Sequence, residues 1–82
     1  MTSRNINRKT RILVGQRLLA LRTAQGLTQE AAAKKVGIKQ SHLSKIERGC
    51  GTSLGLLMRL VAVYGSSLDQ VVAPEAEKSP AA

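Results

Sequence analysis

The chain has 82 residues, which allows one compact domain but not an enzyme domain joined to a separate regulatory one. Its apolar residues are almost all Ala, Leu, Val and Ile, with no Phe or Trp, so we expect an all-α fold. The net charge of +8 favours a polyanionic partner, above all nucleic acid. A membrane partner is not expected, because no apolar run approaches the roughly eighteen residues of a membrane span.

The sequence offers little for metal or redox chemistry, because it holds one cysteine, Cys50, and one histidine, His42. A lone cysteine forms no internal disulfide, and a structural zinc site needs about four ligands. We therefore expect no metal, no cofactor and a cytoplasmic location. Enzyme activity is not expected either, because no carboxylate pair, activated nucleophile or glycine-rich phosphate loop is recognisable.

The first helix is predicted over residues 10–25. Val14, Leu18 and Leu21 recur at the spacing of one helical face, and Gly26 can end the helix in a left-handed conformation. The preceding residues 1–9 are rich in Arg and Lys, which indicates a flexible basic arm.

Two short helices are predicted next. Thr28 can cap the first of them, which runs to Val36 and ends at Gly37. The second covers residues 40–48 and ends at Gly49. Gly37 also allows the sharp turn between them, as in a helix-turn-helix.

A fourth helix is predicted over residues 54–64, capped by Thr52 or Ser53. The spacing suggests an inner stripe of Leu54, Leu57, Val61 and Tyr64.

The last helix is predicted over residues 68–72, opened by a capping box of Ser67 and Gln70. Residues 74–82 are mostly Ala, Glu, Ser and Pro, and we expect a disordered tail there. Residues 10–73 then form the single domain.

The small residue Ala33, where two helices would cross, and the apolar Val36, Ile38, Leu43 and Ile46 also suit a helix-turn-helix over residues 29–48. Four segments, VGQRL (14–18), GLTQE (26–30), VGI (36–38) and LSKIERG (43–49), resemble the Cro and phage-repressor (XRE-like) helix-turn-helix family. The resemblance covers about residues 12–72. It implies a compact five-helix bundle of the lambda-repressor type, with the second and third helices forming the helix-turn-helix, and binding to double-stranded DNA.

A helical projection at about 100° per residue divides the third helix into two faces. Leu43, Ile46 and Glu47 cluster on the inner side, and Ser41 and Lys45 lie opposite. We expect Ser41 and Lys45 to contact base edges in the major groove.

Gln40 stands in the first turn of that helix, where its amide can make the paired contact to adenine N6 and N7. His42 lies on the edge of the outer face. A base contact, a phosphate contact, a pH-sensing role and simple solvation all remain open for it.

Other residues are expected to contact phosphates. The family resemblance implies this for Gln29, at the start of the second helix, whose side chain can also support the recognition helix. Lys39 cannot cap the third helix as the Ser or Thr of the family does, so a phosphate contact is the alternative. Ser44, Arg48 and the backbone N–H groups around Gly49 complete the set.

Arg22 and Glu47 resemble a pair that in this family joins the first helix to the end of the third. We expect a structural ion pair, since Glu47 projects inward.

A homodimer on a palindromic operator is expected, because regulators of this type present two recognition helices about 34 Å apart. The candidate interface residues are apolar, and some could instead be core: Leu56, Leu60, Val63, Val71 and Val72.

The family resemblance leaves the biological role open. We favour an autoregulatory transcriptional regulator of the controller or compact-repressor type, which could also contact RNA polymerase. The alternatives are an antitoxin that binds a toxin protein and represses its own operon, and a basic module that binds an acidic protein.

Overall fold

The computed structural model describes residues 8–73, and within them it contains five helices and no strand. The predicted all-α class is therefore confirmed. The helices are α1 (Arg8–Ala24), α2 (Gln29–Val36), α3 (Gln40–Glu47), α4 (Leu54–Val63) and α5 (Leu68–Val72). The predicted basic arm and tail fall mainly on residues 1–7 and 74–82, which lie outside the described residues. Arg8 and Lys9, assigned to the arm, belong to the first turn of α1.

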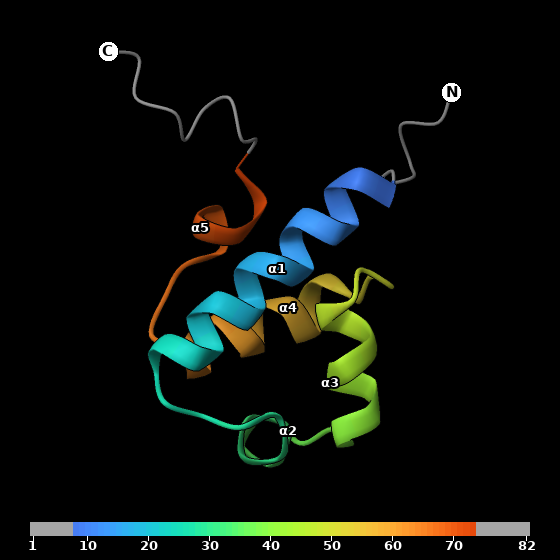
Figure 1. Cartoon of the computed structure of the whole chain (residues 1–82). Coiled ribbons are helices and arrows are strands. Elements are labelled where there is room, and N and C mark those ends of the chain that lie inside the picture. The colour runs from blue at the N-terminus through green and yellow to red at the C-terminus, as the bar shows by residue number, and fades with distance from the viewer. Residues whose placement is uncertain (1–7, 74–82) are drawn as a thin grey trace.

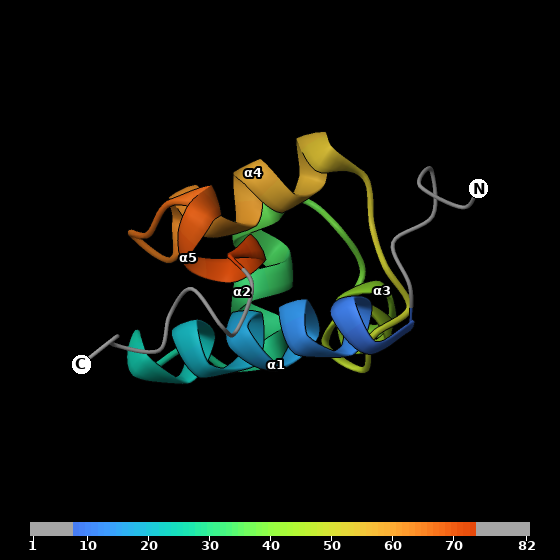
Figure 2. The same ribbon diagram turned by 90° about the horizontal axis from the view of Figure 1, so that it is seen from above.

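The helices pack as a small bundle in which α2 contacts α3 and α4, and α1 contacts α3 and α5. Figure 2 shows α1 and α4 along opposite sides of the molecule with α2 running between them. In Figure 1, α3 follows α2 at one end of α1, and α5 returns to pack against α1 and α4. The second and third helices thus form the predicted helix-turn-helix, held from behind by α1 and α4.

The core is built from aliphatic side chains of all five helices and one aromatic ring. Its largest fully buried members are Tyr64, Leu18, Leu43, Leu60 and Val71. Because α2 contributes only the small side chains of Ala32 and Ala33 together with Val36, its neighbours can approach it closely.

The buried stripe of α4 differs from the expected one. Leu54 was predicted to face the core, but it is 61% exposed, whereas Leu56 and Leu60 are buried beside Leu57 and Val61. The helix is apolar enough that periodicity fits more than one face. Its packing against α2 and α5 selects the buried one.

The predicted ends of α2 and the predicted start of α4 are confirmed. The Thr28 hydroxyl accepts a hydrogen bond from the Ala31 N–H at 3.0 Å, and Gly37 ends α2 with a φ of +91°. Of the two candidate caps for α4, it is Ser53 that accepts, from the Leu56 N–H at 3.1 Å.

The capping box predicted for α5 is wrong. Ser67 occupies the N-cap position, but its side chain makes no cap hydrogen bond. Its hydroxyl donates instead to the Asp69 carboxylate at 2.7 Å. A hydrogen bond to a charged carboxylate is stronger than one between neutral groups. The Ser67 hydroxyl therefore bonds to Asp69 and does not form a capping box with Gln70.

Gly15 lets α1 touch the end of α3 backbone to backbone. A Cβ at this position would lie 2.6 Å from the Glu47 carbonyl oxygen and 2.7 Å from that of Ile46. No other residue leaves room for this contact, which sets the position of α3 relative to α1.

Several arginines hold helix ends together. Arg59 donates to the carbonyl of Val36, the last residue of α2, at 2.5 Å. Arg17 donates to the carbonyls of Val71 and Ala73, at the end of α5. These carbonyls have no partner within their own helices, so arginine satisfies them. Part of the positive charge is therefore used inside the fold.

Candidate nucleic-acid interface

A buried ion pair joins α1 to the end of α3, between the two residues for which it was expected. The guanidinium of Arg22 donates from Nε to Oε2 of Glu47 at 2.7 Å and from Nη2 to Oε1 at 3.2 Å. The two residues are 9% and 6% exposed. The hydrogen bond to Glu47 raises the pKa of Arg22 above its ordinary value.

The same arginine also braces the segment that leads into α2. Its Nη1 donates to the carbonyl of Leu27 at 2.8 Å, one residue before the N-cap Thr28. One side chain of α1 therefore contacts both the entry to α2 and the last residue of α3, so it fixes the two helices relative to each other.

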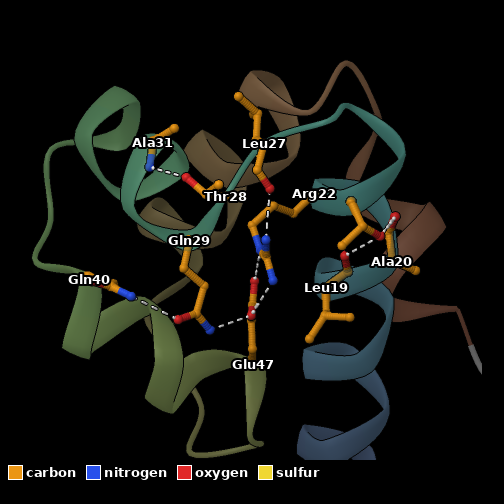
Figure 3. A network of polar contacts seen from close by, with 10 residues as sticks. Leu19, Ala20, Arg22, Leu27, Thr28, Gln29, Ala31, Gln40 and Glu47 are labelled. Carbon is orange, nitrogen blue, oxygen red and sulfur yellow. Dashed lines mark hydrogen bonds and ion pairs between the residues drawn. The ribbon is translucent and has the colours of Figure 1, made fainter.

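The polar network continues from the ion pair to the surface, as Figure 3 shows. Gln29, in the first turn of α2, donates from Nε2 to Oε1 of Glu47 at 2.9 Å. Gln40, in the first turn of α3, donates from Nε2 to Oε1 of Gln29 at 3.3 Å. The starts of both helices are thus linked to the buried pair.

The two faces of α3 lie as the projection predicts. Leu43, Ile46 and Glu47 are buried against the rest of the domain. The four residues expected to contact bases are all exposed: Gln40, Ser41, His42 and Lys45. One polar face of this helix is therefore open to a partner.

The residues expected to contact phosphates surround that face. Lys39 is exposed at the N-cap of α3 and makes no side-chain cap hydrogen bond. Arg48 is exposed at the opposite end, and Ser44 and Gln29 are partly buried. Both ends of α3 therefore carry a cation.

In the segment after α3, the N–H of Gly49, which was expected to contact a phosphate, makes a hydrogen bond within the fold. This N–H donates to the carbonyl of Ile46 at 3.0 Å, and the Cys50 N–H donates to that of Lys45 at 3.0 Å. Gly49 is buried, with a φ of +98°, so the segment closes the end of α3 as a Schellman motif. Both N–H groups are already used within the fold.

Arg11 of α1 lies over this segment, which sequence reasoning did not anticipate. Its Nε donates to the Gly49 carbonyl at 3.3 Å, and its side chain lies against Gly51, where a Cβ would be 3.0 Å from Cδ. The basic start of α1 is therefore held beside the end of the recognition helix.

The expected dimer interface needs correction. Leu60 and Val71 are 0% exposed, and Leu56 is only 8% exposed. α2 and α5 cover the side of α4 that carries Leu56 and Leu60, and α5 buries Val71 by packing against α1 and α4. These three belong to the core of one chain, so they do not supply an exposed apolar surface for a second. Val63 is partly buried and Val72 is 43% exposed, so these two remain candidates.

Tyr64 is a buried polar group in the core. It is 1% exposed, and its hydroxyl makes no hydrogen bond in the structure of residues 8–73. Burial raises its pKa to about 12, and the negative charge of Glu47 acts in the same direction. The hydroxyl is therefore neutral at physiological pH.

Within residues 8–73, no three side chains among His, Cys, Asp and Glu come together as metal ligands. None of the helices described is long and apolar enough to cross a membrane. Cys50 is a free, exposed thiol in the segment after α3.

Comparison with known proteins identifies relatives of this domain. The helix-turn-helix family HTH_3 matches residues 18–71. The uncharacterized HTH-type transcriptional regulator YazB of Bacillus subtilis strain 168 is 39% identical over 62 residues, which cover 74% of this chain and 90% of YazB. The HTH-type transcriptional regulator PuuR of Escherichia coli K12 is 37% identical over 68 residues, which cover 80% of this chain. The matched region spans only 37% of PuuR.

Solved structures show the same arrangement of helices. The restriction-modification controller protein C.AhdI of Aeromonas hydrophila superposes with a TM-score of 0.69 at 34% identity, over 73% of this chain and 92% of that one. The biofilm master regulator SinR, solved in complex with DNA, superposes with a TM-score of 0.62 at 34% identity, over 66% and 89%.

The family match covers more than half of the chain, and YazB is matched over nearly its whole length. The structure agrees with that match. The matched residues 18–71 contain the helix-turn-helix, the ion pair behind it and the exposed polar face of α3. The chain therefore belongs to the XRE-type helix-turn-helix family HTH_3.

Proposed function

We propose that this protein recognises a specific sequence of double-stranded DNA by placing the exposed face of α3 in the major groove. The observation that carries the proposal is the division of α3, whose inner side is buried while its polar outer side is open. An α-helix fits the major groove, where each base pair presents its own pattern of donors and acceptors. The likeness to SinR, which was solved in complex with DNA, supports this placement.

In this proposal, the exposed residues of α3 read the bases. Gln40 and Ser41 lie in the first turn, which enters the groove, and Lys45 lies one turn further along the same face. His42, on the edge of the face, is a fourth candidate for base contact.

Phosphate contacts are proposed on both sides of the groove. Gln29 and Lys39 flank the start of α3, and the first turn of α2 adds the positive end of its helix dipole. Ser44 lies within the second half of α3, and Arg48 is its C-cap. The N–H groups of Gly49 and Cys50 are used within the fold. At this end of α3, the positive charge for a phosphate is therefore supplied by Arg11 of α1.

We further propose that the protein binds a palindromic operator as a homodimer. Val72 is exposed beside a groove between α1 and α5 that Ile12 and Leu13 also line. Val63 is partly buried at the end of α4. A second copy covering Val72 and the groove between α1 and α5 would remove apolar surface from water, and the dimer would present two recognition helices to one operator.

A controller-type, non-enzymatic role is proposed on the likeness to C.AhdI, a restriction-modification controller protein, with the promoter of the protein's own gene as the target. RNA polymerase would be a further partner at such a promoter. No contact among residues 8–73 singles out an antitoxin role or a protein-interaction role.

The test is a binding titration against DNA from upstream of the gene, with a scrambled duplex of the same length as competitor. We expect a complex at nanomolar concentration that is at least about a thousandfold tighter than the scrambled complex. Lys45→Ala should weaken the specific complex, whereas Lys34→Ala, in the last turn of α2, should not. Equal affinity for both duplexes would contradict the proposal, and the absence of a complex with either duplex would favour an acidic protein as the partner.

A further inference from the structure

The polar network from Arg22 to Gln40 has a direction. Arg22 donates to Glu47, Gln29 donates to Glu47, and Gln40 donates to Gln29. The network begins at a buried residue and ends at an exposed one, which faces the proposed DNA. Figure 3 shows the three side chains Glu47, Gln29 and Gln40 in line.

The direction follows from the chemistry of Glu47. A carboxylate paired with arginine has only acceptor oxygens, so Gln29 can bond to it only by its NH₂ group. The Gln29 carbonyl oxygen must then point the other way, toward Gln40. Gln40 can bond to that oxygen only by donating from its NH₂ group. The Glu47 carboxylate therefore determines the amide orientation of Gln40 through Gln29.

This orientation decides what Gln40 presents to a base. One N–H of its NH₂ group is used by Gln29, which leaves the other N–H and the carbonyl oxygen for a ligand. Adenine matches such a pair, with its N7 acceptor and N6 donor, whereas guanine shows two acceptors, N7 and O6. A reversed amide would bring its NH₂ group to the place of the oxygen, where it suits guanine O6.

We propose that Glu47, acting through Gln29, fixes the amide of Gln40 so that adenine is preferred over guanine at the base pair that Gln40 contacts. Glu47 is thereby a positioning residue for sequence readout in addition to its structural pairing with Arg22. This inference rests on the proposed function, since it requires Gln40 to contact a base.

The test compares affinities for operators that differ at one base pair. The relevant position is the one at which Gln40→Ala abolishes base preference. Gln29→Met keeps the length of the side chain but removes both amide hydrogen bonds, so the adenine-to-guanine preference there should fall about tenfold. A lost phosphate contact at Gln29 would weaken all operators equally, so the ratio of affinities isolates the orientation effect.

Glu47 itself is tested in the double variant Arg22→Met/Glu47→Met, because removing one partner alone would leave a buried charge unpaired. Apolar residues of similar size can replace a buried ion pair without loss of the fold. Thermal melting and affinity for non-specific DNA check that the variant is folded. It should lose the adenine preference as Gln29→Met does, while preferences at other positions persist.

A matched control places Gln29→Met in the Gln40→Ala background, where no further change in base preference is expected. An unchanged adenine-to-guanine ratio in Gln29→Met or in the folded double variant would overturn the inference and leave the proposed function intact. If the unsubstituted protein shows no sequence-preferring complex, the proposed function and the inference both fail.

Discussion

The two faces of α3 perform different tasks within eight residues. Its inner face is buried against α1 and α2, where Leu43, Ile46 and Glu47 hold the helix in place. Its outer face carries exposed polar side chains that contribute little to packing. A helix this short is only marginally stable alone, so its position depends on the inner face. Stability and recognition should therefore respond to different substitutions.

The largest expected effect comes from breaking the inner face at its ion pair. Arg22→Met leaves the Glu47 carboxylate buried without its partner and should lower the free energy of unfolding by about 3–5 kcal/mol. Urea denaturation measures this loss. Arg48→Met, at the exposed end of α3, should cost less than about 1 kcal/mol. Similar losses in the two variants would show that burial does not distinguish these arginines.

A second test of the buried side uses pH. Because the pKa of Tyr64 is raised to about 12 in the folded state, the unfolded chain ionises first as the pH rises above about 10. Folding stability is complete below that pH and should fall by about 2–3 kcal/mol as the pH approaches 12. Phenolate absorbance follows the titration cleanly, since Tyr64 is the only tyrosine and there is no tryptophan.

The control for this pH effect is Tyr64→Phe, which removes the titrating group. The difference in stability between the two proteins should change only in the alkaline range. Below it, Tyr64→Phe should be neutral or stabilising, because the hydroxyl is buried without a partner. A phenol that titrates near its ordinary pKa in the folded protein would contradict the prediction.

The contact between α1 and α3 offers a third test. Gly15→Ala places a methyl group against the backbone of Ile46 and Glu47 and should destabilise the fold by about 2 kcal/mol. It should also weaken DNA binding, because α3 must move. Gly55→Ala is the matched control: a Cβ there meets nothing within 4 Å, and the better helix propensity should stabilise α4 slightly. Equal effects at both glycines would be inconsistent with the close approach.

The outer face should show the opposite response. Gln40→Ala should weaken specific binding by about 1–3 kcal/mol and relax one base position. Its effect on unfolding should stay within about 0.5 kcal/mol, as for most exposed substitutions. Competition binding and urea denaturation on the same preparation separate the two quantities. A large loss of stability would place Gln40 among the structural residues.

The smallest effect is expected where the two tasks meet, at the N-cap of α3. Lys39→Ser supplies the missing cap and should stabilise the fold by about 1 kcal/mol. If Lys39 contacts a phosphate, the same change should reduce the number of counterions released on DNA binding by nearly one. The slope of the logarithm of affinity against the logarithm of salt concentration measures this number. Lys35→Ser, in the last turn of α2, should change neither stability nor salt dependence as much. An unchanged salt slope would exclude the contact of Lys39.

Sequence patterns predicted the helices well because their signals are local. Thr28, Gly37 and Ser53 act on backbone groups three or four residues away, so their roles follow from neighbouring positions. The projection of α3 also separated its faces, because its two apolar residues lie on one side of the helix and its exposed polar residues on the other. Arg22 and Glu47 were paired by family resemblance, since 25 residues separate them.

Patterns were insufficient where more than one partner was possible. In α4 almost every residue is apolar, and only the positions of α2 and α5 decide that Leu60 is buried and Leu54 exposed. The Gly49 N–H suits a phosphate or a carbonyl equally well, and the turn after α3 supplies the carbonyl. Arg17 could bind DNA as readily as the end of α5 until α5 is folded beside it.

The sequence alone therefore determined the five helices of residues 8–73, with a helix-turn-helix between Gln29 and Arg48, because caps, glycines and apolar spacing act over a few residues. Only the tertiary structure decided which polar groups meet. It brought Glu47, Gln29 and Gln40 into one hydrogen-bonded line, because the contact of α1 with α3 at Gly15 and the ion pair from Arg22 fix where the two helices begin and end.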